Sequence, residues 1–512
     1  MSRFTRHPLT PIVLLLLINM AAGVLTFKDY GLSWDEPLFY NYADSIRIAY
    51  TPQAFSPGFD FYSVFGKSPE DHKIYGPAYL LMARPFEQML TAAPGIDMAS
   101  AWHLINFLTF QIGLLIFYFL ARRWLAPWPA AAATAFMAWQ PVFWGHAFIN
   151  PKDIPFMVLF MLSLLLGLGL VDRLTGEEKK PWGYLLVSAL VLGLASATRV
   201  IGPLAGALIF VYFLFKKGWR SLPLFILYGS IAVIIMYIFW PYLWADPLNR
   251  LVEVFKHMSN NPTELAVLFE GQIFRANDMP RSYLLQMFAR TLTDPTWFLF
   301  VFGCFVAIWR VRNRNLEWRG LLVVFSLFTF MLAYLLYNKP SVYDGFRHFF
   351  FITPPIFLMI GFGFEWLFEK LNPLLWSVII LLLVLPGLIG IVHLHPYEYA
   401  YYNFMSGGES GAFRSFETEY WLTCYKEAVE WARVNDPNST LHIQREFPLA
   451  QYYGQGMNLK NLEQETEADV QSGDLLLFHT RGDLDIRSIY RKMPVIHTIG
   501  RDGAEFCLIK QK

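Results

Sequence analysis

The chain has 512 residues, of which 55% are hydrophobic and only 16% are charged. Because soluble domains are typically about a quarter charged, this composition excludes an ordinary soluble protein. The formal net charge of +1 gives no electrostatic basis for binding nucleic acid. The three cysteines form no CxxC or Cys/His cluster at zinc spacing, so no cofactor is predicted, and a divalent metal is left open but not indicated.

Apolar runs of about 15 to 25 residues divide the chain, and about 20 helical residues cross a bilayer core. The first run follows Arg3 and Arg6 and has the outline of a secretory signal, but its length favours an uncleaved helix. The region 184–215 carries Arg199 in its middle, so two helices with Arg199 at the turn are expected. Eleven spans are predicted: 11–27, 101–121, 128–149, 154–171, 184–198, 200–215, 222–244, 295–309, 320–337, 349–368 and 373–392.

Basic residues between the spans predict the orientation, because cytoplasmic loops carry an excess of Lys and Arg. With a cytoplasmic N-terminus, the cytoplasmic loops hold Arg122, Arg123, Arg173, Lys179, Lys180, Lys216, Lys217, Arg220, Arg310, Arg312, Arg314 and Arg319. The outer side then receives the polar stretches GLSWDEP (31–37), NPKDIP (150–155) and YDGFRH (343–348), the loop 245–294 and the tail from 393.

The first outer loop, 28–100, is too long for a simple connector. Its stretch 72–90 has aromatic, leucine and charged residues at helical spacing and predicts an interfacial amphipathic helix. The tail 393–512 has ordinary charge content, turn signals and short β-like runs, which predict a small α/β domain outside the membrane. The expected fold is therefore an all-α polytopic membrane domain, 1–392, with about 11 transmembrane helices and a C-terminal extracytoplasmic α/β domain, 393–512.

Three outer acids are candidates for chemistry. Asp35 and Glu36 follow the first span closely. They are either residues of a solvated loop start, caps of an interfacial helix that begins at Pro37, or a general base near the bilayer surface. Asp153, between Pro151 and Pro155, is either a turn residue or a second catalytic acid.

Several outer cations are candidates for binding a phosphate. Each alone is most often a snorkelling interface residue, but a group of them can bind a phosphate or pyrophosphate. Arg347 is the first choice and Lys73 the second, with Arg84, Arg199 and His348 as further members. Two cysteines, Cys424 and Cys507, lie in the outer tail, and whether they form a disulfide is open.

Taken together, these motifs resemble the GT-C glycosyltransferases, in the branch of protein O-mannosyltransferases and aminoarabinose transferases (family 39/83-like). The resemblance rests on WDEP, NPKDIP, YDGFRH and the stretch HPYEYAYYNFMSGGESGAF…FETEYW (395–421). It implies a GT-C fold, a polyprenyl-phosphate-sugar donor and inversion at the anomeric carbon. By position it implies Asp35 as catalytic base, Glu36 as its companion, Asp153 as second acid, and Lys73 and Arg347 as phosphate ligands. The chain lacks the repeated MIR-like module of the eukaryotic enzymes, which leaves a protein acceptor in question.

The predicted function is a hexosyl or pentosyl transferase of a bacterial inner membrane, acting on the periplasmic side. Its expected partners are a polyprenyl-phosphate-sugar, a lipid, polysaccharide or protein acceptor, and membrane lipid. The sequence also permits a transporter or flippase of a lipid-linked or small polar substrate, because intramembrane charge and broken helices suit one. A structural subunit that presents 393–512 is a third alternative, but it leaves the outer acids without a role.

Overall fold

The computed structural model describes residues 7–176, 181–259, 263–313 and 316–512. Arg3, Arg6, Lys179, Lys180 and Arg314, which bear on the first span and the orientation, lie outside the described residues. The helices of the N-terminal part are α1 Thr10–Thr26, α2 Glu36–Ser45, α3 Pro69–His72, α4 Ala78–Thr91, α5 Met98–Ala121, α6 Pro127–Ala138, α7 Pro141–Ile149, α8 Asp153–Thr175, α9 Trp182–Ser196, α10 Pro203–Phe215, α11 Leu222–Ile238, α12 Pro247–Ser259, α13 Ser282–Thr291, α14 Pro295–Arg312, α15 Trp318–Asn338, α16 Pro354–Lys370 and α17 Pro373–Leu394.

The C-terminal part contains short helices and a small sheet. They are α18 Gly408–Ala412, α19 Tyr425–Asn435, α20 Phe447–Tyr453, α21 Leu484–Arg487, β3 Leu441–Ile443, β4 Leu459–Asn461, β5 Leu475–His479, β6 Val495–Arg501 and β7 Ala504–Gln511; a separate hairpin pairs β1 Ala266–Phe269 with β2 Gln272–Arg275. The predicted fold class, a helical membrane domain with a small C-terminal α/β domain, is confirmed.

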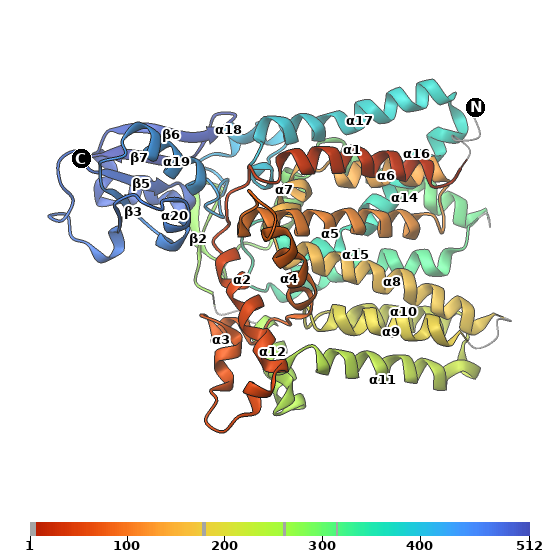
Figure 1. The fold of residues 1–512 in the computed structure, drawn as a ribbon. Coiled ribbons are helices and arrows are strands. Elements are labelled where there is room, and N and C mark those ends of the chain that lie inside the picture. The colour runs from red at the N-terminus through yellow and green to blue at the C-terminus, as the bar shows by residue number, and fades with distance from the viewer. Residues whose placement is uncertain (1–6, 177–180, 260–262, 314–315) are drawn as a thin grey trace.

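Long apolar helices run side by side, and the C-terminal sheet lies at one end of them (Figure 1). Among the described residues, six helical segments are long and apolar enough to cross a membrane: Met98–Ala121, Asp153–Thr175, Trp219–Ile238, Pro295–Arg312, Trp318–Asn338 and Pro373–Leu394. Three shorter apolar helices, α1, α9 and α10, accompany them. The chain is an integral membrane protein, and the predicted number of eleven spans stays a prediction.

Three predicted spans have clearly different boundaries in the structure. The α-helix of the run 222–244 ends at Ile238, and a separate 3₁₀ turn begins at Pro241, because proline favours a helix start. The run 128–149 is divided into α6 and α7, because Pro141 starts a new helix and the residue before it, Gln140, has extended backbone. The run 349–368 begins its α-helix only at Pro354, after a 3₁₀ turn over Arg347–Ile352, because two prolines favour a helix start there.

The predicted interfacial helix 72–90 is also wrong in its extent. The chain turns after α3 and starts α4 at Ala78, because Pro77 cannot continue a helix from the preceding residues. At Gly76 a side chain would lie 2.0 Å from the carbonyl oxygen of Ala197, so glycine permits this close approach to the turn after α9. That turn lies between α9 and α10 and contains Arg199, as predicted.

The C-terminal sheet has the strand order β4-β3-β5-β7-β6. Strand β3 pairs in parallel with β4 and β5, whereas β7 pairs antiparallel with β5 and β6. All five residues of β5 are buried, which agrees with a central strand covered on both faces. Cys424 and Cys507 form a disulfide that joins the segment before α19 to β7.

Candidate active site

Asp35 directly precedes α2, but its side chain does not cap that helix. The carboxylate instead accepts a hydrogen bond from Lys152 Nζ at 2.6 Å, and Arg347 Nη1 lies 3.8 Å from the same oxygen. The side chain of Asp35 is 25% exposed, whereas that of Arg347 is 2% exposed. The capping alternative is therefore wrong for Asp35, and its carboxylate faces cations at a partly open surface.

A cavity of about 320 Å³ opens beside Asp35. Its lining residues come mainly from the segment 28–100, the NPKDIP turn and the end of α12. Helices α2 and α12 lie toward the end of the helix bundle that is nearest the sheet (Figure 1). The cavity wall mixes polar and apolar side chains, and its lining residues are Asp35, Leu38, Phe39, Ser68, Asp71, His72, Ile74, Tyr75, Lys152, His257, Met258, Thr263 and Tyr343. This mixed wall suits a ligand that has both a polar and a lipid part.

A network of buried charges lies behind this wall. Arg199 Nη2 is 2.8 Å from one oxygen of Asp153, and Arg347 Nη1 is 3.3 Å from the other. Arg347 also bonds Asp344 at 3.0 Å, and Arg481 from the C-terminal domain is 2.8 Å from the second oxygen of Asp344. We define the charge cluster as Asp35, Lys152, Asp153, Arg199, Asp344, Arg347 and Arg481.

The charge cluster has a net positive formal charge. It contains four cations and three carboxylates, which gives +1 when all are ionised. Burial raises the pKa of Asp35, but Lys152 and Arg347 outweigh that effect, so the pKa of this carboxyl lies below its usual value. Asp35 is therefore ionised at neutral pH, as a proton acceptor must be.

Two other cations predicted to bind phosphate, Lys73 and His348, do not line the cavity. Lys73 pairs with Glu70 at 2.7 Å and lies 3.8 Å from Glu253, and it does not line the cavity. The carbonyl oxygen of His348 accepts a hydrogen bond from Arg199, so His348 adjoins the charge cluster through its backbone.

Arg84 does not join the charge cluster either: it pairs with Asp44 at 2.5 Å and with Glu87. Among the described residues, Lys152 is the lysine or arginine on the cavity wall, and neither Arg347 nor Lys73 lines it. No group of three His, Cys, Asp or Glu side chains suited to a metal ion occurs among the residues that the structure describes.

Glu36 lies apart from the charge cluster. Its carboxylate is fully buried, accepts hydrogen bonds from the Ser33 backbone at 2.6 Å and from the Tyr40 hydroxyl, and lies 3.0 Å from His103 Nε2. These contacts hold the turn that presents Asp35. The structure thus separates the two neighbouring acids, one toward the cavity and one toward the core.

Glu36→Gln is expected to lower thermal stability more than activity. The glutamine NH₂ group would face a donor, the Ser33 N–H or the Tyr40 hydroxyl, that now donates to the carboxylate. Loss of such a buried hydrogen bond lowers the free energy of unfolding by about 1–3 kcal/mol. Calorimetric or fluorescence melting of the purified protein checks this, with exposed Glu70→Gln as the matched control. A large loss of turnover at an unchanged melting temperature would instead make Glu36 a participant in the reaction.

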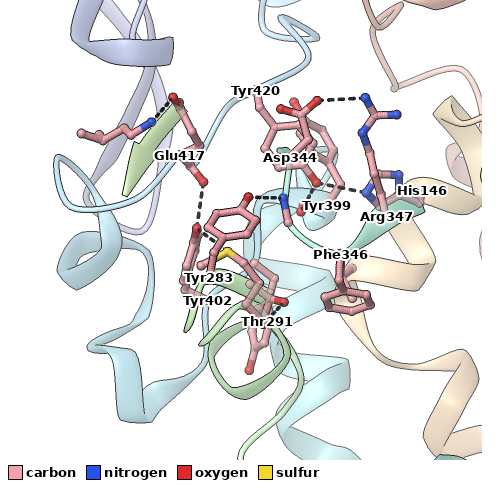
Figure 2. A pocket seen from close by; sticks show the side chains of 15 residues that line it. His146, Tyr283, Thr291, Asp344, Phe346, Arg347, Tyr399, Tyr402, Glu417 and Tyr420 are labelled. Carbon is pink, nitrogen blue, oxygen red and sulfur yellow. Dashed lines mark hydrogen bonds and ion pairs between the residues drawn. The ribbon is translucent and has the colours of Figure 1, made fainter. Parts of the chain in front are cut away.

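A second, smaller cavity of about 20 Å³ is lined in part by Arg347 (Figure 2) and has room for about one water molecule. Arg347 and Asp344 lie at its wall, and His146 Nε2 is 3.0 Å from the Tyr420 hydroxyl there. Glu417 completes the polar lining and accepts hydrogen bonds from the backbone of Leu268 and Gly482.

Burial raises the pKa of Glu417 to about 7, although Arg481 opposes the shift. An unfolded chain has an ordinary glutamate pKa of about 4.3, so the folded protein binds the additional proton between those values. Stability should therefore fall as pH rises from about 4.5 to 7. Melting temperatures measured across this range should fall less steeply in Glu417→Gln than in the wild type. Identical slopes would contradict this assignment.

Three members of the charge cluster were missed by sequence reasoning. Lys152 lies in the motif NPKDIP, next to Asp153, and Asp344 lies in the motif YDGFRH, three residues before Arg347. Their closeness in sequence to two predicted site residues is the feature that could have identified them. Arg481 lies 134 residues after Arg347 and has no local pattern that points to the site.

Comparison with solved structures shows which folds this chain resembles. The chain matches the oligosaccharyltransferase AglB from Archaeoglobus fulgidus, in complex with an inhibitory peptide and a dolichol-phosphate, with a TM-score of 0.52, 11% identity and coverage of 96% of this chain and 71% of that chain. The apo form gives a TM-score of 0.51 with 12% identity, 96% and 71% coverage. ArnT from Cupriavidus metallidurans, bound to undecaprenyl phosphate, matches with a TM-score of 0.49, 11% identity and 97% coverage of each chain.

Residues 95–244 match the family model described as dolichyl-phosphate-mannose-protein mannosyltransferase. This segment contains Lys152, Asp153 and Arg199 but neither Asp35 nor Arg347. No curated protein matches the chain. A family model of mannosyltransferases thus matches one segment of the chain, and over most of its length the chain has a fold similar to that of AglB.

Proposed function

We propose that this protein transfers a sugar from a polyprenyl-phosphate donor to an acceptor at the outer surface of a bacterial inner membrane, with Asp35 as general base. The observation that carries the proposal is an ionised carboxylate on the wall of a cavity, bonded to Lys152 and backed by a net positive cluster. The AglB and ArnT structures contain dolichol-phosphate and undecaprenyl phosphate, which supports a lipid-phosphate donor here.

The reaction follows from this arrangement. Asp35 takes the proton from an acceptor hydroxyl or amine, whose freed electron pair attacks the anomeric carbon from the face opposite the phosphate. The bond between that carbon and the phosphate oxygen breaks, and its electrons leave with the phosphate. An in-line displacement of this kind inverts the anomeric centre. No strong acid is required, because phosphate is already a good leaving group.

Lys152 is proposed as the first phosphate ligand, because among the described residues it is the lysine or arginine that lines the cavity. Arg347 and Arg199 lie behind it and are proposed to contribute positive potential and to fix Asp153, the second acid. Charge that develops on the leaving phosphate is stabilised by such preorganised cations. In this proposal Lys73 and His348 are not direct phosphate ligands, and Glu36 is a positioning residue.

The donor's lipid tail requires an apolar route to the cavity. Leu38, Phe39, Ile74 and Met258 supply apolar wall, and α12 is amphipathic, with Leu248, Val252 and Phe255 exposed. We place the N-terminus in the cytoplasm, and the cavity and the C-terminal domain in the periplasm. The sugar and the acceptor, whether lipid, polysaccharide or protein, are left to experiment.

Transfer and transport are distinguished in proteoliposomes loaded with a panel of polyprenyl-phosphate-sugars and cell-envelope acceptors. The proposal predicts a glycosylated acceptor and free polyprenyl phosphate in equal amounts. Movement of intact donor across the bilayer without glycosylation would identify the rival transporter or flippase. Mass spectrometry of envelope lipids and polysaccharides, with and without the protein, would identify the sugar and the acceptor by the missing residue.

A further inference from the structure

A lipid-facing gap lies between α14 and α15, at the end of the helices away from the charge cluster. Helix α14 packs closely on α16, whereas α14 and α15 make few contacts with each other among the described residues. Arg312 at the end of α14 lies roughly 25 Å along the helix axis from Pro295. Pro295 follows four residues after Thr291, which lines the 20 Å³ cavity beside Arg347. Side chains of the two helices meet at Phe300, Phe325 and Phe328, and the gap lies from there toward the Arg312 end of α14.

This gap contains a cavity of about 330 Å³. Its lining is apolar except for the thiol of Cys304 and the guanidinium of Arg312. The lining residues are Cys304, Ala307, Ile308, Val311, Arg312, Trp318, Leu321, Leu322, Phe325 and Met359. We call it the α14–α15 slot. Ile308 and Leu322 are exposed on its rim, so the slot opens to the hydrocarbon of the bilayer.

Arg312 at the slot's mouth has no ion-pair partner among the described residues. Its neighbour Arg310, by contrast, pairs with Glu369 at 2.8 Å and lies 3.5 Å from Glu365. The nearby carboxylate of Glu317 is engaged otherwise, because it accepts hydrogen bonds from the first backbone N–H groups of α15. Within the described part of the chain, the positive charge at the mouth of the slot is therefore not compensated by an ion pair.

We propose that the α14–α15 slot binds a phospholipid with a net anionic headgroup, with one acyl chain in the slot and the phosphate on Arg312. A lipid tail gains little binding free energy by moving from the bilayer into an apolar slot. The slot also contacts only the tail, so by itself it does not select between headgroups. The arginine supplies the selectivity through charge-assisted hydrogen bonds to phosphate. Trp318, half-exposed at the same level, suits the headgroup boundary.

Native mass spectrometry of delipidated protein with phosphatidylglycerol or phosphatidylcholine of identical chains tests this inference. The wild type should retain phosphatidylglycerol about tenfold better. Arg312→Gln should bring the two lipids close to parity, and Ala307→Phe, which fills the slot, should reduce retention of both. Arg220→Gln removes an exposed cation outside the slot and is the matched control.

Because Cys304 lies in the slot and the other two cysteines are bridged, phosphatidylglycerol should also slow alkylation of this thiol by N-ethylmaleimide.

Equal retention of the two lipids by the wild type would overturn the proposal, as would preference for phosphatidylglycerol that survives Arg312→Gln. A dimer that Ala307→Phe dissociates, with lipid retention unchanged, would assign the slot to a second copy of the chain and contradict the lipid assignment. All these readouts are independent of sugar transfer, so they stand or fall separately from the proposed enzymatic function.

Discussion

Asp35→Asn is expected to reduce sugar transfer by about 10²–10⁴-fold, the range that general-base catalysis contributes. The amide keeps the size of the side chain and accepts a hydrogen bond from Lys152, but it cannot take a proton from the acceptor. Donor binding and the melting temperature should change little, since Asp35 is partly exposed and does not cap α2. The measurement is turnover with a polyprenyl-phosphate-sugar donor beside donor binding in the same preparation.

Asp44→Asn is the matched control for this substitution. Asp44 lies on α2, nine residues after Asp35, and pairs with Arg84 away from the cavity. The same loss of one carboxylate there should leave turnover near the wild-type value. Full turnover in Asp35→Asn would remove this residue from the mechanism.

Arg347→Lys is expected to reduce transfer by about 100-fold or more while the protein remains folded. The guanidinium fork bonds Asp344 with one nitrogen and approaches Asp153 with another, and it lies over the Trp421 ring. A lysine retains the charge but cannot hold both carboxylates in one plane. Arg347→Met should be worse, because it leaves buried carboxylates uncompensated, at a cost of about 3–5 kcal/mol.

Kinetics and melting temperatures of both variants separate these effects. Arg414→Lys supplies the control, because Arg414 bonds Asp485 with two nitrogens in the C-terminal domain, outside the charge cluster. If Arg347→Lys matches Arg414→Lys in turnover, the geometry of the fork has no catalytic importance.

Most of the architecture is predictable from hydropathy, because a bilayer imposes one length on every span. The division of 184–215 at Arg199 follows from the cost of a charge in hydrocarbon. The errors occur where proline acts inside an apolar run, as at Pro141 and Pro354. Mean hydropathy over a segment hides single prolines. A proline nevertheless interrupts the backbone hydrogen bonds of a helix, so a new helix begins there.

The site is predictable only in part, for a related reason. Asp35, Asp153, Arg199 and Arg347 were identified from their outer position, and they lie within one network. The predicted side of the membrane does not show which of two neighbouring side chains faces the cavity. For this reason the sequence groups Glu36 with Asp35, although Glu36 faces the core. For the same reason the contact between Lys152 and Asp35 is not predicted.

Arg481 depends on how the C-terminal domain docks on the membrane domain. Its guanidinium reaches Asp344 from a segment far along the chain, and it lies over the Trp34 ring. No local sequence pattern encodes a contact of this kind, which only the packed fold brings about. The C-terminal domain thus contributes a charge to the site rather than merely covering it.

The most direct test of the central claim is a structure of Asp35→Asn with a polyprenyl-phosphate-sugar bound. The account predicts that the sugar occupies the cavity beside residue 35, with the phosphate on Lys152 and an open path for the acceptor to the opposite face of the anomeric carbon. A donor whose phosphate binds elsewhere, with its sugar out of reach of residue 35, would contradict it.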